Sequence, residues 1–280
     1  MEKIDLHIHT SISDGNLSVK EVIDLAKEKE CIKIAITDHE KVNDYTNIAK
    51  ENNILITNGI EFNSSYNGMH ILGYGMNDIE YMKKVTTEIN NENEEVCFSL
   101  IELLYNNGFD ITKQEVINYI KSIGINYDIM DKKKIVKYLV YKGYAKTTYD
   151  AYQSLIGKNQ KYYIPIKKLT PKEIIELIDK CGGVSVLAHP KTLRLEEIEL
   201  LKKIKELYEN GLDGIEILNT SSDPENIKLY RKVANDLRLI CTVGSDFHNC
   251  KEQNLGVHIE DDIFYKFEER IKVKNKKSMI

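Results

Sequence analysis

The sequence predicts an α/β fold with a parallel sheet and a helical insertion. Short apolar segments alternate with segments of helical periodicity, which is typical of consecutive βα units. Several predicted strands end in a histidine or an acidic residue, and in closed barrels this end of the strands carries the active site. From about residue 78 to 166 the alternation stops, and the chain becomes polar and helical. We therefore expect a discontinuous barrel domain at 1–77 and 167–280, with 78–166 as a helical insertion or cap domain.

The first barrel segment contains apolar stretches that we interpret as strands, at residues 3–9, 33–37, 54–57 leading into 59–62, and 69–74. The first helix begins at Ser18, because Ser18 and Glu21 fit a capping box ahead of an apolar face. A second helix is expected through about residues 42–52. Along the first strand, a period of two places His7 and His9 on one face, where two imidazoles can bind a divalent metal ion.

The insertion contains predicted helices near residues 79–106, 112–122, 131–142 and 147–156. The alternation resumes where Thr170 and Glu173 form a second capping box, with Pro171 at the first helical position. Predicted strands and helices then alternate, with strands at 183–188, 214–219 and 239–243, and helices near 195–210, 224–237 and beyond 260. An open doubly wound sheet is the structural alternative. It would need a nucleotide-binding loop, and the sequence contains no Gly-x-Gly-x-x-Gly or Walker pattern.

Composition and charge are ordinary for a globular protein, with 42% hydrophobic and 30% charged residues. No apolar run has the length of a membrane span, and no basic-then-apolar leader precedes the first strand, so we expect a cytoplasmic protein without a membrane partner. The net charge of −5 argues against binding to nucleic-acid duplexes through charge alone. The five cysteines are scattered without a Cys-x-x-Cys pair, which excludes a disulfide framework and a zinc ribbon.

Nine histidine and acidic residues lie at or near predicted strand ends or in the loops that follow: His7, His9, Asp14, His39, Glu61, His70, His189, Asp246 and His248. Each alone has an ordinary structural explanation, such as a hydrogen-bonded histidine or a turn aspartate. Together they exceed the roughly four to six ligands of one metal ion, and they would suit two or three ions that share a carboxylate. Nitrogen and oxygen donors without thiolate favour manganese, zinc or iron, and such clusters are typical of metal-assisted hydrolysis.

These residues lie in short motifs that resemble, in the same order, those of the PHP (polymerase and histidinol phosphatase) superfamily. The motifs are His7-Ile8-His9-Thr10, Ser13-Asp14-Gly15, Thr37-Asp38-His39, Gly59-Ile60-Glu61, His70-Ile71-Leu72-Gly73-Tyr74, Ala188-His189-Pro190 and Ser245-Asp246-Phe247-His248. The resemblance extends from residue 5 to about 256. It implies a distorted (β/α)7 barrel, similar to a TIM barrel, with a trinuclear metal site and a bridging hydroxide that attacks phosphorus. The ions expected are Mn²⁺, with Zn²⁺ or Fe²⁺ as alternatives.

The resemblance also implies which residues bind each ion. One ion would be bound by His7, His9, Glu61 and Asp246, a second by Asp14, His39 and His248, and a third by Glu61, His70 and His189. Glu61 would bridge, and the implied catalytic residues are Glu61, Asp246 and His248. His70 begins its predicted strand instead of ending it. Either that strand boundary or the direction of that strand must therefore differ from a parallel pattern.

Asp14 and the long insertion resemble the stand-alone phosphoesterase branch of the superfamily, since histidinol phosphatases more usually carry a histidine at the position of Asp14. This branch includes 3′,5′-nucleotide bisphosphate phosphatases and ribonucleases that trim short RNA from the 5′ end. The resemblance therefore implies a metal-dependent phosphoric ester hydrolase whose substrate is a nucleotide or a short single-stranded RNA. The alternatives are a small-metabolite phosphatase, such as a histidinol phosphatase, and a non-catalytic metal-binding regulatory module.

Candidate substrate-binding residues are basic side chains near the start of one insertion helix and after the Ala-His-Pro motif: Lys132, Lys133, Lys134, Lys191 and Arg194. Relatives in this branch tend to carry an Arg-Pro-His type motif where this chain has its lysine run. Lysine attracts phosphate as a point charge but lacks the bidentate fork of arginine, and a solvated charge run explains the lysines equally well. His258 matches no ligand position, and we interpret it as structural.

Overall fold

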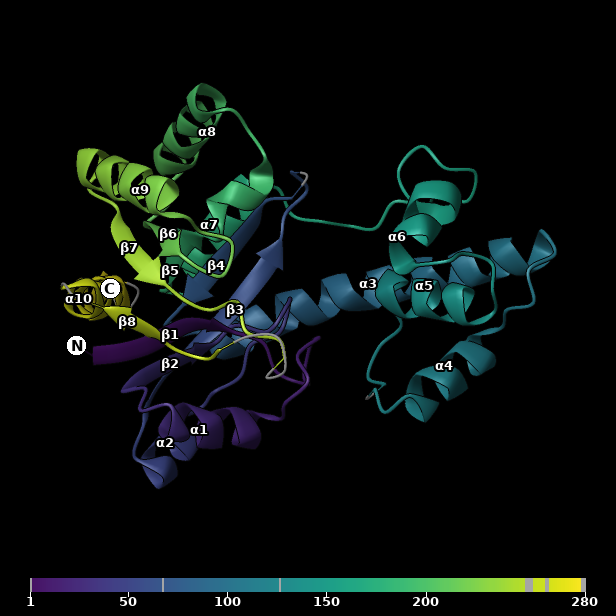
Figure 1. The fold of residues 1–280 in the computed structure, drawn as a ribbon, viewed down its shortest axis with the longest axis horizontal. Helices are drawn as coiled ribbons and strands as arrows, with labels where there is room; N and C mark the ends of the chain where they lie inside the picture. Colours follow the sequence, from purple (N-terminus) through teal and green to yellow (C-terminus); the bar gives the residue numbers. More distant parts are fainter. Residues whose placement is uncertain (1, 67, 126, 250–253, 260–261, 278–280) are drawn as a thin grey trace. The chain divides into compact units, whose positions relative to one another are not determined.

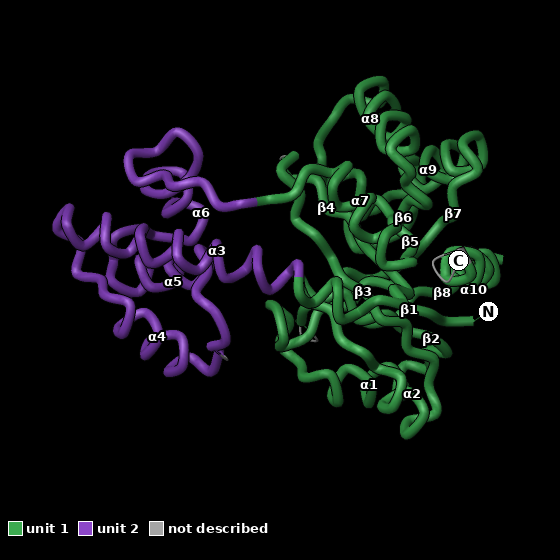
Figure 2. The backbone as a smooth tube through the Cα atoms, turned by 180° about the vertical axis from the view of Figure 1, so that it is seen from behind, with its two compact units in different colours: residues 1–84, 168–280 green, residues 85–167 purple. Residues whose placement is uncertain are grey.

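The computed structural model describes residues 2–66, 68–125, 127–249, 254–259 and 262–277, so Cys250 lies outside the described residues. The chain divides into two compact units (Figure 2). Unit 1 contains Met1–Lys84 and Lys168–Ile280, and unit 2 contains Val85–Lys167. All of the predicted metal ligands belong to unit 1, whereas the predicted lysine run at 132–134 belongs to unit 2.

Unit 1 is built on one sheet, which has eight strands in the described part of the chain. They are β1 (Glu2–Ile8), β2 (Lys33–Ile36), β3 (Leu55–Asn63), β4 (His70–Tyr74), β5 (Val184–Leu187), β6 (Gly214–Leu218), β7 (Ile240–Val243) and β8 (Val257–Ile259). Their order in the sheet is β7-β6-β5-β4-β3-β2-β1-β8. A bridge between Ile8 and Phe247 brings the segment after β7 beside β1, so the sheet curls into a nearly closed barrel.

The predicted α/β barrel is confirmed, with a departure at β4. β1, β2 and β3 are parallel to one another, as are β5, β6 and β7. β4 runs antiparallel to both β3 and β5. The first residue of β4, His70, therefore lies at the same edge as the last residues of its neighbours. β8 pairs antiparallel with β1, and its three residues are too few for an alternation to be recognised in the sequence.

The helices of unit 1 are α1 (Val19–Glu28), α2 (Thr46–Asn52), α7 (Pro171–Lys180), α8 (Glu197–Glu209), α9 (Pro224–Leu237) and α10 (Ile263–Lys277). Figure 1 shows α1 and α2 beside β1 and β2, and α7, α8 and α9 around the other half of the sheet. Both predicted capping boxes are confirmed, at Ser18 and at Thr170. None of the helices in the described residues has both the length and the apolar character needed to cross a membrane.

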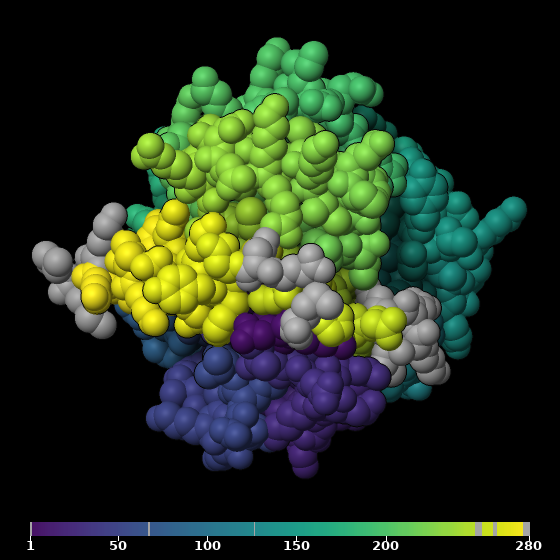
Figure 3. Space-filling model, turned by 60° about the vertical axis from the view of Figure 1, so that its left-hand side comes forward, coloured from purple at the N-terminus to yellow at the C-terminus, as the bar shows by residue number. Residues whose placement is uncertain are grey.

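The C-terminal helix α10, predicted beyond residue 260, packs against the barrel. In the space-filling view it lies, in yellow, between α9 in light green and the N-terminal segment in purple (Figure 3). Arg270 and Lys274 of α10 reach the buried carboxylate of Asp213, each at 3.0 Å. Asp213 also accepts the Ser185 backbone N–H at 3.1 Å. This ionic cluster joins α10 to the amino-terminal ends of β5 and β6.

A glycine allows the two ends of the barrel sequence to meet. A Cβ atom on Gly244 would lie 2.3 Å from the Cβ atom of His7 and 2.6 Å from its backbone nitrogen. No other residue type fits this approach without moving β1, because real Cβ contacts are not that short. The chain after β7 can therefore pass directly against the strand that carries His7 and His9.

Unit 2 is helical and has its own apolar core. Its helices are α3 (Ile79–Asn106), whose first residues belong to unit 1, α4 (Lys113–Ser122), α5 (Lys132–Tyr141) and α6 (Thr148–Ala151), which continues as a π-helical turn at Tyr152–Ile156. Leu100 and Leu104 of α3, Val116 of α4 and Leu139 of α5 are completely buried in one cluster. These contacts hold the helices of unit 2 together without residues from the barrel sequence.

Leu139→Ala is expected to destabilise unit 2 by about 2–5 kcal/mol, because it removes a fully buried side chain and leaves a cavity. Urea unfolding, followed by the helical signal in far-ultraviolet circular dichroism, measures the change. Lys137→Ala, on an exposed position of the same helix, is the matched control and should change the free energy by no more than about 0.5 kcal/mol. Equal midpoints for the two variants would contradict the assignment of Leu139 to the core.

Candidate metal centre

One buried carboxylate lies at the centre of the predicted ligands. Glu61, in β3, is 1% exposed. Its two oxygens lie 2.9–3.4 Å from ring nitrogens of five histidines: His7, His9, His39, His70 and His189. Oε1 faces His70 and His189, and Oε2 faces the other three. A carboxylate so surrounded can bridge cations that the imidazoles bind.

The deepest group of possible ligand atoms comes from His7, His9, Glu61 and Asp246, all within 4.8 Å of one another. Asp246 Oδ1 lies 3.3 Å from the Nε2 atoms of both His7 and His9. These four residues are the ones that the resemblance implies for the first ion. β1 supplies the two histidines, and the segment after β7 supplies Asp246 across the closure of the barrel.

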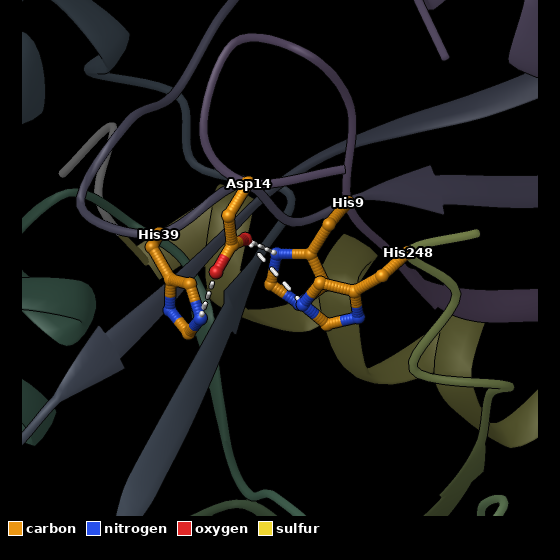
Figure 4. A group of neighbouring side chains, drawn as sticks. All are labelled: His9, Asp14, His39 and His248. Atoms are coloured by element: carbon orange, nitrogen blue, oxygen red, sulfur yellow. Dashed lines mark ion pairs between the residues drawn. The ribbon is translucent and has the colours of Figure 1, made fainter. Parts of the chain in front are cut away.

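A second group combines His9, Asp14, His39 and His248 (Figure 4). Asp14 lies between the three rings, with Oδ1 at 3.4 Å from His248 Nε2 and 3.6 Å from His9 Nδ1, and with Oδ2 at 3.7 Å from His39 Nε2. His9 thus presents Nδ1 to this group and Nε2 to the deeper one. A neutral imidazole has one free lone pair, so His9 can serve one of the two positions as a ligand.

The third group contains His39, Glu61 and His70. The resemblance instead implies Glu61, His70 and His189 for the third ion. His189 Nε2 does lie 2.9 Å from Glu61 Oε1, the same oxygen that faces His70 Nδ1 at 2.9 Å. The structure therefore brings all nine predicted ligands into one cluster. Either His39 or His189 lies close enough to complete the third group with Glu61 and His70.

Burial differs sharply between the two sides of the cluster. His7, His9 and Glu61 are at most 1% exposed, whereas the side chains of Asp14 and His248 are about 30% exposed. The shielded side holds the shared carboxylate in a low-dielectric environment, where electrostatic interactions are stronger. The more exposed side chains of the cluster are those of Asp14, Asp246, His70 and His248, at 24–32% exposure.

The histidines and carboxylates of the cluster shift one another's pKa values. Burial opposes ionisation of Glu61, yet the nearby His39 and His7 outweigh it and hold the pKa of Glu61 well below its usual value. Burial likewise disfavours charge on His9, yet its contacts with Asp246 and Glu61 raise the pKa of His9 to about 9. Protonated imidazoles and ionised carboxylates thus stabilise one another. Divalent cations would take the place of those protons.

Asp5 holds the two chain segments of the deep group together. This completely buried carboxylate accepts hydrogen bonds from the backbone N–H groups of His7, Ser245 and Gly256 at 3.2, 2.9 and 2.8 Å. It also accepts the Ser245 hydroxyl at 2.6 Å. Asp246 directly follows Ser245 and adopts a positive φ of 54°. The hydrogen bonds between Asp5 and Ser245 help to maintain this conformation.

Asp38 and Glu216 support the cluster in the same way. Asp38 accepts the Thr10 N–H at 2.8 Å, the Thr10 hydroxyl at 2.7 Å and the Ser13 hydroxyl at 2.6 Å, which fixes the loop that carries Asp14. Glu216 lies 2.9 Å from His7 Nδ1. The sequence prediction did not include Asp5, Asp38 or Glu216. The available signal was an acidic residue within or directly after an apolar strand, which is rare without a buried partner.

The predicted substrate-binding residues have local partners or lie on exposed surface. Lys191 lies in the short 3-10 turn after His189, and its Nζ is 2.7 Å from Asp223 Oδ2. Arg194 is exposed at the end of that turn. In unit 2, Lys134 is buried beside Asp131 at 2.6 Å, Lys132 donates to the Ile164 carbonyl, and Lys133 is exposed. Their part in substrate binding remains a prediction.

The donor set fits divalent cations. The nine residues supply imidazole nitrogens and carboxylate oxygens at one place, with no thiolate among them. Mn²⁺, Fe²⁺ and Zn²⁺ all accept such ligands, and none of these ions needs a donor type that the cluster lacks. The acidic residues provide negative charge where cations would bind.

Comparison with known proteins gives consistent matches over almost the whole chain. The family model described as PHP domain matches residues 5–217. A 5′-3′ exoribonuclease of Haemophilus influenzae is 24% identical over 264 residues, which cover 92% of this chain and 95% of that protein. A 3′,5′-nucleoside bisphosphate phosphatase of Chromobacterium violaceum is 24% identical over 272 residues, which cover 93% of each. The solved structure of a candidate metal-dependent phosphoesterase from Bifidobacterium adolescentis is similar to this chain, with a TM-score of 0.74 and 25% sequence identity. The match covers 95% of this chain and 96% of that chain.

Proposed function

Because the chain belongs to the PHP domain family, we propose that it is a metal-dependent phosphoric ester hydrolase acting on nucleotides or short single-stranded RNA. The observation that carries this proposal is the single carboxylate of Glu61 facing five histidines at 2.9–3.4 Å. The relatives named above include a bisphosphate phosphatase and an exoribonuclease, which supports phosphate monoesters or diesters of nucleotides as the substrate class.

Three divalent ions, with Mn²⁺ expected, are proposed for the positions set out above. They would neutralise charge on the phosphoryl oxygens and lower the pKa of a water molecule, so that it can lose a proton near neutral pH and attack phosphorus. His7, His9, Glu61 and Asp246 would hold one ion at the shielded side. Asp14, His39 and His248 would hold another at the exposed side, and Glu61 with His70 and His189 the third.

At the exposed side, a backbone contact would fix which nitrogen of His248 serves as a ligand. His248 is about a third exposed, and its Nδ1 lies 2.8 Å from the Asp246 backbone carbonyl, which fixes the direction of the ring. With Nδ1 donating to that carbonyl, the lone pair of Nε2 is directed toward Asp14 Oδ1 at 3.4 Å, where an ion would be held. A water molecule would then be the group that protonates the leaving oxygen.

The proposal is tested by elemental analysis of the purified protein, followed by a panel of phosphoesters, in which release of inorganic phosphate is measured for the monoesters and release of nucleoside monophosphates for the RNA. The panel contains adenosine 3′,5′-bisphosphate, a 5′-phosphorylated short RNA and histidinol phosphate, each with Mn²⁺, Zn²⁺ or Fe²⁺. We expect bound divalent metal and turnover of the nucleotide substrates. Turnover of histidinol phosphate alone would indicate a small-metabolite phosphatase. A protein that binds no metal and hydrolyses none of the three would instead be the regulatory module considered above.

A further inference from the structure

Glu216 is a charged residue in the middle of an apolar strand. It lies in β6 between Ile215 and Ile217, and all three side chains are completely buried. Its carboxylate is not among the nine predicted ligands. A buried carboxylate is costly unless its oxygens are hydrogen-bonded, so its partners indicate what it does.

One oxygen of Glu216 faces the back of the His7 ring. Glu216 Oε1 is 2.9 Å from His7 Nδ1, whereas His7 Nε2 points into the cluster, 3.3 Å from Asp246 Oδ1. An ionised carboxylate only accepts, so Nδ1 must carry the hydrogen. In the neutral ring, Nε2 is then left with its lone pair directed toward the cluster, which is the form that can bind a cation.

The other oxygen of Glu216 faces the segment that carries His189. Glu216 Oε2 accepts the His189 backbone N–H at 2.7 Å and the Asn219 side-chain amide at 3.1 Å. His189 has a positive φ of 27°, which is strained for a residue other than glycine. The hydrogen bond that the His189 N–H donates to Glu216 therefore helps to hold the conformation in which His189 Nε2 lies 2.9 Å from Glu61.

We propose that Glu216 is a positioning residue that sets the tautomer of His7 and the backbone of His189, so that both histidines are ready to bind metal. This inference rests on the proposed function. Glu216 contacts residues of two proposed ion positions, because His7 belongs to the first position and His189 to the third. A single buried carboxylate would thus tune two sites, as outer carboxylates do behind metal-bound histidines in general.

Glu216→Gln tests this proposal with almost no change of volume. A glutamine can accept from the His189 N–H, but its amide group must then donate to His7 Nδ1, which moves the hydrogen of His7 to Nε2. We expect Mn²⁺ affinity, measured by calorimetry on protein stripped with a chelator, to fall about 10- to 100-fold. The number of ions retained after gel filtration should also decrease.

Asp213→Asn is the matched control. Asp213 is also a buried carboxylate, 5% exposed, and directly precedes β6 at the end away from the cluster. Its partners are Ser185, Arg270 and Lys274, none of which belongs to the cluster. This variant should lower the melting temperature while Mn²⁺ affinity remains that of the wild type. A loss of affinity in both variants would show that Glu216 acts only through stability and would overturn the proposal.

A second measurement reads the tautomer of His7 directly in the wild-type protein. In the metal-free protein at alkaline pH, where the ring is neutral, nitrogen-detected NMR of labelled imidazoles should show His7 as the Nδ1–H form, with the signal identified by its absence from His7→Asn. The Nε2–H form would overturn the inference. If the wild type binds Mn²⁺ and Glu216→Gln binds it equally well, this inference fails alone. If the wild type binds no divalent metal, the proposed function fails, and this inference fails with it.

Discussion

Glu61→Gln is expected to lower kcat by more than about 100-fold. Residues behind metal ligands usually cost about 10- to 100-fold when removed, and Glu61 faces five histidines directly. The amide has nearly the same shape, but it carries no charge and places a donor where cations would bind. Phosphate release from adenosine 3′,5′-bisphosphate and metal content per protein are measured together.

Two further variants make this result interpretable. His70→Ala removes a ring that contacts only one oxygen of Glu61, so it should reduce activity and metal content less than Glu61→Gln. His258→Ala changes an exposed histidine of β8 that takes no part in the cluster, and its activity should equal that of the wild type. Full activity in Glu61→Gln would refute the bridging role.

Asp5→Ala is expected to be the most destabilising of these substitutions, at about 3 kcal/mol or more. The alanine leaves three backbone N–H groups and one hydroxyl without their acceptor, and each unsatisfied buried donor costs about 1–3 kcal/mol. Total stabilities of such domains are only about 5–15 kcal/mol, so the variant loses a large share. Urea unfolding of metal-free protein measures the effect without a contribution from bound ions.

The control for this effect is Asp24→Ala, an exposed aspartate of α1, which should change the free energy by no more than about 0.5 kcal/mol. Asp5→Ala should also weaken metal binding, because Ser245, which directly precedes Asp246, loses its hydrogen bonds to β1. An unfolding midpoint equal to that of Asp24→Ala would contradict the closing role of Asp5.

The helices and most strands could be predicted because their signals are local. A capping box such as Ser18 with Glu21 involves residues three apart, and its contacts form in the structure as the sequence predicts. The nine candidate ligands could be collected for a related reason. Most of them lie at the end of a short apolar stretch or in the loop that follows it, and parallel strands have their carboxyl ends at one edge of the sheet.

The direction of β4 could not be obtained locally. The stretch from His70 to Tyr74 has the same composition whether it runs parallel or antiparallel, and only pairing with β3 and β5 decides between them. This pairing explains how a histidine that begins a strand reaches the same site as histidines that follow other strands. His70 therefore reaches the site only because β4 runs opposite to its neighbours in the tertiary fold.

The sequence by itself determined which residue types are available for metal binding, because histidine, aspartate and glutamate side chains carry that chemistry wherever they are placed. The tertiary structure alone decided how they share it. Closure of the barrel places Asp246 beside His7 and His9, and it leaves His9 facing two groups at once. It also gives Asp5 and Glu216 their partners, which lie 240 and 209 residues away in the chain. Hydrogen bonds across such separations depend on packing, and no local pattern encodes them.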